Sequence, residues 1–250
     1  MRSLLDLFRK PPRATEGPLA PLQIEIGNRP IAIKLKRSAR ARRLTLRLDR
    51  DGEGAIITLP NRVSRAEAQR FALKSSGWIE KQLANSPAKT KITDGGIIHL
   101  RGEPLNVSFT GRARGVVLHD VAAHTLHVPG LEAHAGRRLF EWLKSQAHHD
   151  LAAASAKYAR TMETRIASVT VRDQKSRWGS CTSSGALSYS WRLILAPTYV
   201  LDYVAAHEVA HCLEMNHGPK FWRLVLTHCP HTRKAKDWLK KHGKDLHGIG

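Results

Sequence analysis

Cysteine and long apolar runs are scarce in this 250-residue chain, and each shortage excludes a class of protein. The three cysteines form no C-x-x-C pair and cannot all pair with one another, so we expect no disulfide framework and a reducing compartment. No apolar run approaches the roughly 18 residues that a membrane-spanning helix requires, so no transmembrane segment is expected. The apolar segment within residues 1–10 is too short and too charged for a signal peptide. Cytoplasmic localisation follows as the prediction.

Acidic residues are also few, with 21 Asp and Glu against 41 Lys and Arg, which gives a formal net charge of +20. Such an excess favours polyanionic partners, namely nucleic acid, ribosomes or anionic membrane surfaces. Because aromatic residues for base stacking are missing from the most basic segment, a solvated surface explains its charge equally well. We keep nucleic acid as a predicted partner of this basic surface, which consists of Lys34, Lys36, Arg37, Arg40, Arg42, Arg43 and Arg47.

Period-two alternation and turn residues predict a β-rich first half and an α+β fold overall. Residues 1–20 contain three prolines and are expected to be a flexible tail. Residues 21–130 are expected to form a β-rich N-terminal region with one helix, which opens at the capping box Ser64–Glu67. The periodic spacing of apolar residues lapses over residues 85–91, which predicts a linker or long loop. No internal repeat is evident in the sequence. A long helical pattern then opens the third segment, residues 131–250.

The motif H-E-x-x-H at residues 207–211 lies within that third segment. His207 and His211 are four residues apart, so on a helix their imidazoles lie on one face and can bind a single metal ion. Glu208 lies beside them as a candidate general base for a metal-bound water. The apolar residues around the motif recur at intervals of three and four, as in a half-buried helix: Val200, Leu201, Val204, Ala205, Ala210 and Leu213.

A catalytic zinc site requires a third protein ligand and an open position. His217 follows His211 by six residues, where Asn216 and Gly218 can turn the chain back toward the helix. Glu214 is the alternative ligand because it falls on the same helix face, but its backbone would stand roughly 7 Å along the axis from a metal centred between the histidines. We therefore predict His217, with His228 and His231 as weaker alternatives.

Several ordered motifs resemble those of the YgjP-like metallopeptidases, a group related to the SprT-like and Wss1-like zinc proteases. They are Gln174-Lys-Ser-Arg-Trp-Gly-Ser-Cys181, Leu187-Ser-Tyr-Ser-Trp-Arg-Leu-Ile-Leu-Ala-Pro197, His207-Glu-Val-Ala-His211 and Asn216-His-Gly-Pro-Lys-Phe-Trp222. The resemblance implies a zincin-like metallopeptidase domain over residues 131–250. It also implies zinc bound by His207, His211 and His217, with Glu208 as the catalytic base.

Two strands, 167–171 and 186–190, are predicted between the long helix and the H-E-x-x-H helix. The segment 177–181 could form the rim of the metal cleft, where an extended peptide adds as another strand, although packing of its tryptophan is the simpler interpretation. The oxyanion formed during hydrolysis needs a further stabilising group. The candidates for that role or for lining the cleft are Tyr189, Arg177, His228 and His231.

The sequence thus predicts a zinc-dependent metallopeptidase that hydrolyses peptide bonds with a Glu-activated, zinc-bound water. Its predicted substrate is a polypeptide, with nucleic-acid-associated proteins as one class. Two alternatives stay open. One is a basic nucleic-acid-binding protein whose metal site is structural or degenerate, and the other is a metal-dependent hydrolase of a non-peptide bond. Cys181 is interpreted as structural, since nothing nearby lowers the pKa of its thiol.

Overall fold

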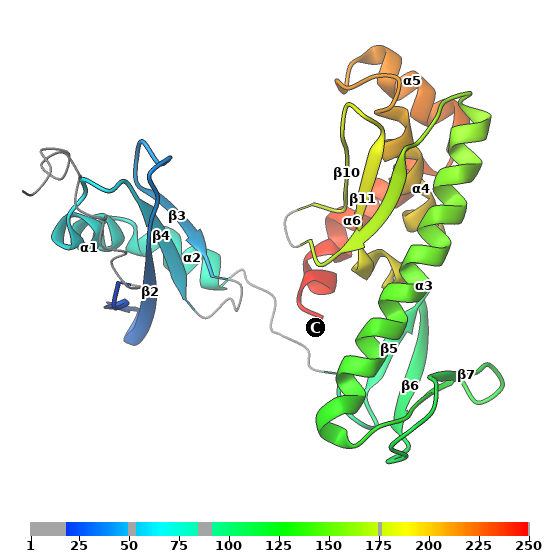
Figure 1. Cartoon of the computed structure of the whole chain (residues 1–250), viewed down its shortest axis with the longest axis horizontal. Coiled ribbons are helices and arrows are strands. Elements are labelled where there is room, and N and C mark those ends of the chain that lie inside the picture. The colour runs from blue at the N-terminus through cyan, green and yellow to red at the C-terminus, as the bar shows by residue number, and fades with distance from the viewer. Residues whose placement is uncertain (1–18, 50–53, 85–91, 175–176, 250) are drawn as a thin grey trace, which may run out of the picture. The chain divides into compact units, whose positions relative to one another are not determined.

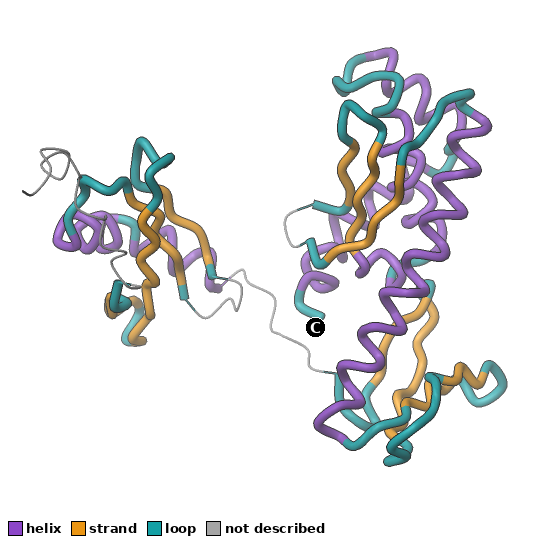
Figure 2. The backbone as a smooth tube through the Cα atoms, viewed as in Figure 1, coloured by secondary structure: helices purple, strands orange, loops and turns teal. Residues whose placement is uncertain are grey.

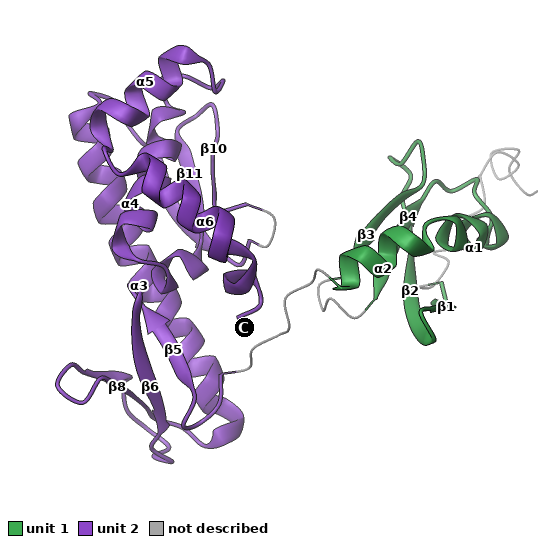
Figure 3. Ribbon diagram, turned by 180° about the vertical axis from the view of Figure 1, so that it is seen from behind, with its two compact units in different colours: residues 1–86 green, residues 87–250 purple. Residues whose placement is uncertain are grey.

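A computed structural model of the chain describes residues 19–49, 54–84, 92–174 and 177–249. The fold is α+β, as predicted, with strands and helices arranged in separate layers (Figures 1 and 2). Residues 1–18 of the predicted tail and the predicted linker at 85–91 fall outside the described residues. The chain divides into two compact units, Met1–Ser86 and Pro87–Gly250 (Figure 3). No helix within the described ranges has the length and apolar character to cross a membrane.

The first unit is a four-stranded sheet with two helices on one face. Alternation over residues 22–26 and 31–35 around Gly27-Asn28 predicts a hairpin, and the structure has it: Gly27 and Asn28 both adopt the positive φ values, +55° and +61°, that a two-residue turn requires. Side chains alternate between a buried face, which packs against the helices, and an exposed face. The strand order is β1-β2-β4-β3, with bounds β1 Leu22–Ile26, β2 Arg29–Arg37, β3 Thr45–Leu48 and β4 Ala55–Leu59.

The single helix predicted in this unit is two helices, α1 (Arg65–Lys74) and α2 (Ser76–Ala84). The Ser64 capping box is confirmed, with the Ser64 side chain accepting from the Glu67 N–H and the Glu67 carboxylate accepting from the Ser64 N–H. The helices separate at Ser75, whose ψ of 8° departs from helical geometry. Ser75 is followed by a serine and Gly77. Because serine and glycine have low helix propensity, three such residues in succession disfavour one continuous helix through this point.

The predicted boundary near residue 130 is corrected by the structure, which places it between Ser86 and Pro87. Strands β5 to β8 form a second sheet that packs on the long helix α3 (Glu132–Thr161). Leu100 and Leu126 of this sheet share one hydrophobic core with Leu139 and Leu143 of α3, so the sheet and the helix belong to the same unit. The strand bounds are β5 Ile97–Leu100, β6 Glu103–Phe109, β7 Leu118–Asp120 and β8 Thr125–Val128.

The two four-stranded sheets have the same connectivity. In each, the first two strands form a hairpin, the second and fourth are parallel, and the third is antiparallel to the fourth. The second hairpin also turns through two residues of positive φ, Arg101 at +54° and Gly102 at +89°. This is a repeat of topology that the sequence did not reveal, because strand pairing constrains the alternation of side chains and not their identities.

The remainder of the second unit surrounds one buried helix, α4 (Thr198–Ala210). It contacts α3, α5 (Pro219–His228), α6 (Thr232–His247) and strand β10, which explains why it is buried on nearly every side and not half-buried as predicted. Leu213, predicted on its apolar face, lies past the helix end and is 46% exposed. The neighbouring three-stranded sheet has the order β10-β11-β9, with bounds β9 Ser168–Arg172, β10 Gly179–Cys181 and β11 Ala186–Ser190.

Candidate metal centre

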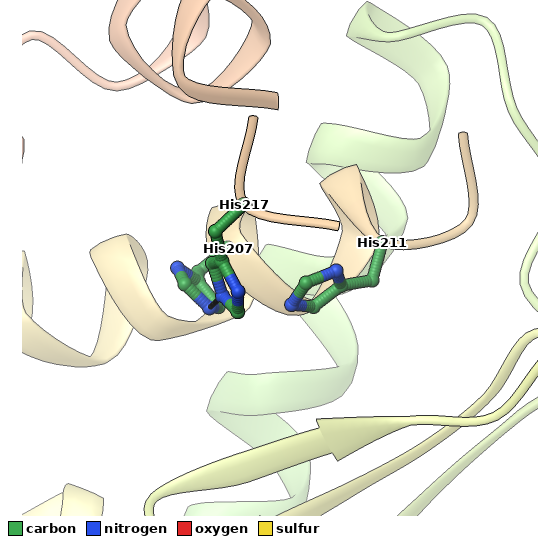
Figure 4. A group of neighbouring side chains, drawn as sticks. All are labelled: His207, His211 and His217. Atoms are coloured by element: carbon green, nitrogen blue, oxygen red, sulfur yellow. Dashed lines mark hydrogen bonds between the residues drawn. The ribbon is translucent and has the colours of Figure 1, made fainter. Parts of the chain in front are cut away.

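Three imidazoles converge at the C-terminal end of α4. His207 and His211 lie one turn apart on the helix, and the chain turns back after residue 213 so that His217 faces them (Figure 4). The Nε2 atoms of His217 and His207 are 3.0 Å apart, and one ligand atom from each of the three rings lies within 4.8 Å of the others. Two nitrogens on one tetrahedral zinc ion stand about 3.3 Å apart, so this spacing suits a shared ion.

Hydrogen bonds orient two of these rings. His211 Nδ1 lies 3.0 Å from the backbone carbonyl oxygen of Glu214, and because a carbonyl can only accept, Nδ1 carries the hydrogen and Nε2 keeps its lone pair. His207 Nδ1 lies 3.5 Å from the hydroxyl of Tyr203 on the previous turn. Such contacts to the far nitrogen fix the tautomer and the ring plane of a metal-binding histidine.

Two of the rings are also desolvated, which favours the neutral form that a metal ligand must have. Phe221, fully buried on α5, packs against all three imidazoles at centroid distances of 4.6 to 4.8 Å. Burial, reinforced by the other two histidines, lowers the pKa of His207 to about 3, and burial also lowers the pKa of His211. His217 is exposed, so the cluster is open to solvent on that side. The three residues therefore fit a zinc ion with an accessible further position.

Glu208 lies on the buried side of α4, between the histidines in sequence and only 6% exposed. Burial raises the pKa of its carboxyl to about 7, and the positive charge of Arg177 opposes that rise. Glu208 packs directly against strand β10: a β-carbon on Gly179 would fall 2.5 Å from its Oε1. Glycine at residue 179 thus leaves the space that the carboxyl group occupies.

Substituting Gly179 with alanine should therefore displace the Glu208 carboxyl group. For the peptidase predicted from the sequence, with Glu208 as its general base, we expect the rate of peptide hydrolysis to fall by about 10- to 100-fold, since displacing such a group by about 1 Å has costs of this order. Zinc content should not change, because the three atoms nearest the new methyl group all belong to Glu208. Gly218→Ala is the matched control, since nothing lies within 4 Å of its would-be β-carbon and its φ of −80° suits alanine. Equal activity of the two variants would contradict this packing argument.

The raised pKa of Glu208 also predicts a pH dependence of stability in the zinc-free protein. An unfolded glutamate loses its proton near pH 4.5, whereas folded Glu208 keeps it until about pH 7. The free energy of unfolding should therefore fall, relative to Glu208→Gln, by on the order of 3 kcal/mol as pH rises through this window. His207 has the opposite effect, because its folded pKa of about 3 makes the protein gain stability as pH rises toward 6.5. Urea unfolding in a chelator at pH 4.5 and 7.5, with Glu214→Gln as control, measures the difference.

The other predicted site residues are placed as follows. The carboxylate of Glu214 is not grouped with the three rings, and Glu214 contributes its backbone carbonyl to His211. Tyr189 is fully buried with its hydroxyl 2.9 Å from the Ser155 hydroxyl, so it cannot meet a substrate. Arg177 is exposed and close enough to influence Glu208.

The two remaining histidines lie apart from the metal cluster. His228 borders a surface hollow on α5 together with Glu214 and Arg223. His231 pairs with Asp202, at 3.0 Å between His231 Nε2 and Asp202 Oδ2. Neither belongs to the group formed by His207, His211 and His217 among the described residues, so neither is its third ligand.

The cysteines behave as structural residues. All three are free thiols. The Sγ atoms of Cys181 and Cys212 lie 3.7 Å apart, and burial, with a contribution from Cys212, raises the pKa of Cys181 to about 12. A thiol with a raised pKa is a poor nucleophile near neutral pH, which supports the structural interpretation. Trp178, at the predicted cleft rim, stacks on His247 with ring centroids 4.3 Å apart and so packs β10 against α6.

Three supporting residues were not identified from the sequence: Tyr203, Phe221 and Gly179. Tyr203 precedes His207 by four residues, so helical spacing alone could have placed its hydroxyl near that ring. Phe221 could have been suspected from its position on the helix that follows His217. Gly179 had no local signal, because its contact with Glu208 joins segments separated by 29 residues.

Comparison with known proteins agrees with this geometry. No curated protein and no solved structure matches the chain. A family model, described as the YgjP-like metallopeptidase domain, matches residues 42–242, which is well over half of the 250 residues and includes every residue of the candidate metal centre. The chain therefore belongs to the YgjP-like metallopeptidase family.

Proposed function

We propose that the protein is a zinc-dependent peptidase with His207, His211 and His217 as metal ligands and Glu208 as general base. The observation that supports this proposal best is the convergence of three imidazoles beside the buried carboxyl group of α4. A purely structural zinc site would be closed by a fourth protein ligand. Here the exposed side of His217 leaves room for water and substrate.

Zinc held by these imidazoles would lower the pKa of a water molecule and polarise the scissile carbonyl group. The residues of the chain supply the proton transfers. Glu208 takes the proton of the attacking water and gives it to the leaving amine, a task suited to a carboxyl group whose pKa lies near 7. Arg177 is the remaining candidate to stabilise the oxyanion, since it is exposed and close enough to act electrostatically on Glu208.

The substrate backbone would bind along β10. This strand is at the edge of its sheet, paired with β11 on one side, and Gly179 places it directly beside Glu208. An extended peptide can pair with such an edge through main-chain hydrogen bonds, largely independent of its sequence. We infer a polypeptide substrate in an extended, locally unfolded conformation.

The direct test is hydrolysis of an unfolded, fluorescently labelled polypeptide by the purified protein. We expect cleavage that a chelator abolishes and added Zn²⁺ restores. A parallel panel of ester, phosphoester and glycoside substrates distinguishes a peptidase from a hydrolase of another bond. Zinc-dependent turnover of one of those substrates without peptide cleavage would overturn the proposal.

A second proposed property, binding of nucleic acid, rests on the exposed face of the first unit. The strand register places Lys34 and Arg47 in one row, on either side of Ile56, and Lys36 is in the next row. Within the described ranges, Arg37 donates to the carbonyl of Asn61 and Lys34 pairs with Asp49.

The remaining basic side chains suggest a test. Arg40, Arg42 and Arg43 are exposed on the loop between β2 and β3, near the strand residues Lys36 and Arg47. If this face binds phosphates, affinity should fall steeply with salt, and replacing Lys36, Arg42 and Arg43 with alanine should reduce the salt slope by about 0.7–0.9 per lost contact. Fluorescence anisotropy with single- and double-stranded oligonucleotides measures the affinity and its salt slope for the wild type and the triple variant. An unchanged slope in the triple variant would rule out this surface.

A further inference from the structure

A second cluster of metal-binding side chains lies where α4 meets the junction of α5 and α6. Asp202 is on α4, one turn and a half before His207, while Cys229 ends α5 and His231 precedes α6. His231 Nε2 lies 3.0 Å from Asp202 Oδ2 and 3.3 Å from Cys229 Sγ, and all three ligand atoms lie within 4.8 Å of one another. Cys229 is fully buried, and Asp202 and His231 are partly exposed.

The arrangement is not that of a catalytic Cys-His-Asp relay. A catalytic Cys-His-Asp relay needs the thiol and the carboxylate on opposite nitrogens of the ring. Here both face the same nitrogen, Nε2 of His231. One hydrogen on Nε2 could be shared between the Asp202 oxygen and the Cys229 sulfur. A cation placed between the three atoms would instead accept a lone pair from each of them, which is the arrangement of a metal site.

We propose that Asp202, Cys229 and His231 bind a second divalent metal ion of the zinc class. Thiolate, imidazole and carboxylate are the three ligand types that zinc accepts, and ligand atoms on one tetrahedral zinc stand about 3.2 to 3.6 Å apart. The distances of 3.0 and 3.3 Å from His231 Nε2 are close to these values. A thiolate and a carboxylate also neutralise the charge of a divalent ion, so the buried side of the site holds no net charge.

Neighbouring residues hold Asp202 in place for this role. The Tyr158 hydroxyl donates to Asp202 Oδ2 at 2.5 Å, and Lys157 pairs with the other oxygen, Oδ1, at 3.2 Å. Hydrogen bonds from outside the coordination sphere orient carboxylate ligands in this way. The Tyr199 ring packs edge-on to His231 at 6.2 Å. The fourth position would be filled by water, since His231 and Asp202 are the exposed members of the cluster.

The second site would have a structural role. It would link α4, the helix of His207 and Glu208, to the segment between α5 and α6 that contains Cys229 and His231. The other end of α5 begins two residues after His217. A metal there would fix the position of α5, and with it Phe221 beneath the three imidazoles. It takes no part in hydrolysis.

Cobalt substitution tests the proposal, because a Co²⁺ ion bound to a thiolate gives a near-ultraviolet charge-transfer band that an all-histidine site lacks. We expect metal-free protein to bind two equivalents of Co²⁺ and to show this band. Cys229→Ser should lose the band and one equivalent, whereas Cys212→Ser, beside the first site, should keep both. His217→Ala should lose one equivalent and keep the band, which separates this site from the proposed catalytic one.

His231→Gln provides a second test at a partly exposed residue, in case Cys229→Ser does not fold. We expect it to weaken the band at a fixed, limiting Co²⁺ concentration, while His228→Gln on the neighbouring helix leaves it unchanged. A wild-type protein that binds a single equivalent with no charge-transfer band would overturn the proposal. A band of full strength in either Cys229→Ser or His231→Gln would overturn it as well.

Discussion

Replacing Glu208 with glutamine is expected to abolish peptide hydrolysis while leaving the zinc content of the protein unchanged. Glutamine has nearly the same shape and fits the space beside Gly179, but it cannot take a proton from water. Loss of a general base typically costs about 10² to 10⁴-fold in rate, and we expect the upper part of this range because no other described carboxylate is grouped with the imidazoles. The measurement is the cleavage rate of a labelled unfolded polypeptide alongside elemental analysis.

Glu214→Gln is the matched control for this substitution. It makes the same chemical change six residues later, on a side chain that is not grouped with the three imidazoles. Activity within about twofold of wild type is expected, because the Glu214 backbone carbonyl that accepts from His211 is retained. If Glu208→Gln kept wild-type activity, Glu208 would not be the base. If it lost zinc together with activity, its role would be to support the metal and not to transfer protons.

Removal of His217 is expected to cost the protein one equivalent of zinc, and peptidase activity with it. His217 is exposed, so truncation to alanine opens no cavity in the core. It removes one of the three proposed ligands, which should weaken zinc binding by more than the roughly 10–100-fold that loss of an outer hydrogen-bond partner costs. Zinc binding only to the folded state raises stability by mass action, so the rise in Tm on adding zinc should shrink in His217→Ala.

Glu214→Ala distinguishes the two ligands that the sequence left in competition. It removes the carboxylate but not the carbonyl that orients His211, so zinc content and the zinc-dependent rise in Tm should match wild type. The opposite pattern, with zinc lost in Glu214→Ala and kept in His217→Ala, would show that the chain rearranges after α4 to bring the carboxylate to the metal. Elemental analysis measures the zinc content of both variants, and thermal unfolding measures their Tm with and without zinc.

Much of the fold could be predicted because local signals agreed with tertiary structure. The Gly27-Asn28 turn has the residues that a tight hairpin needs, and the Ser64 capping box marks the start of α1. The domain boundary at residue 130 was wrong for a physical reason. Which helix covers a sheet depends on which residues share a core, as Leu126 and Leu139 do, and alternation along a strand carries no information about this.

The candidate site was predictable to a similar degree. Helical spacing placed His207 and His211 on one face, and the turn residues around His217 allowed the chain to return. Groups supplied by distant segments were not predictable. Tyr189 was a candidate to stabilise the oxyanion, but its hydroxyl is hydrogen-bonded to Ser155 of α3. The contact between Gly179 and Glu208 depends on how β10 packs against α4. Contacts of this kind arise only once the helices and the sheet have packed.

The account depends on three imidazoles sharing one ion beside Glu208, and anomalous diffraction at the zinc edge from crystals of the zinc-loaded protein measures this directly. We expect a peak about 2.0–2.1 Å from one ring nitrogen each of His207, His211 and His217, with no carboxylate of Glu214 in the coordination sphere. A map with no zinc peak between these three rings would contradict the account.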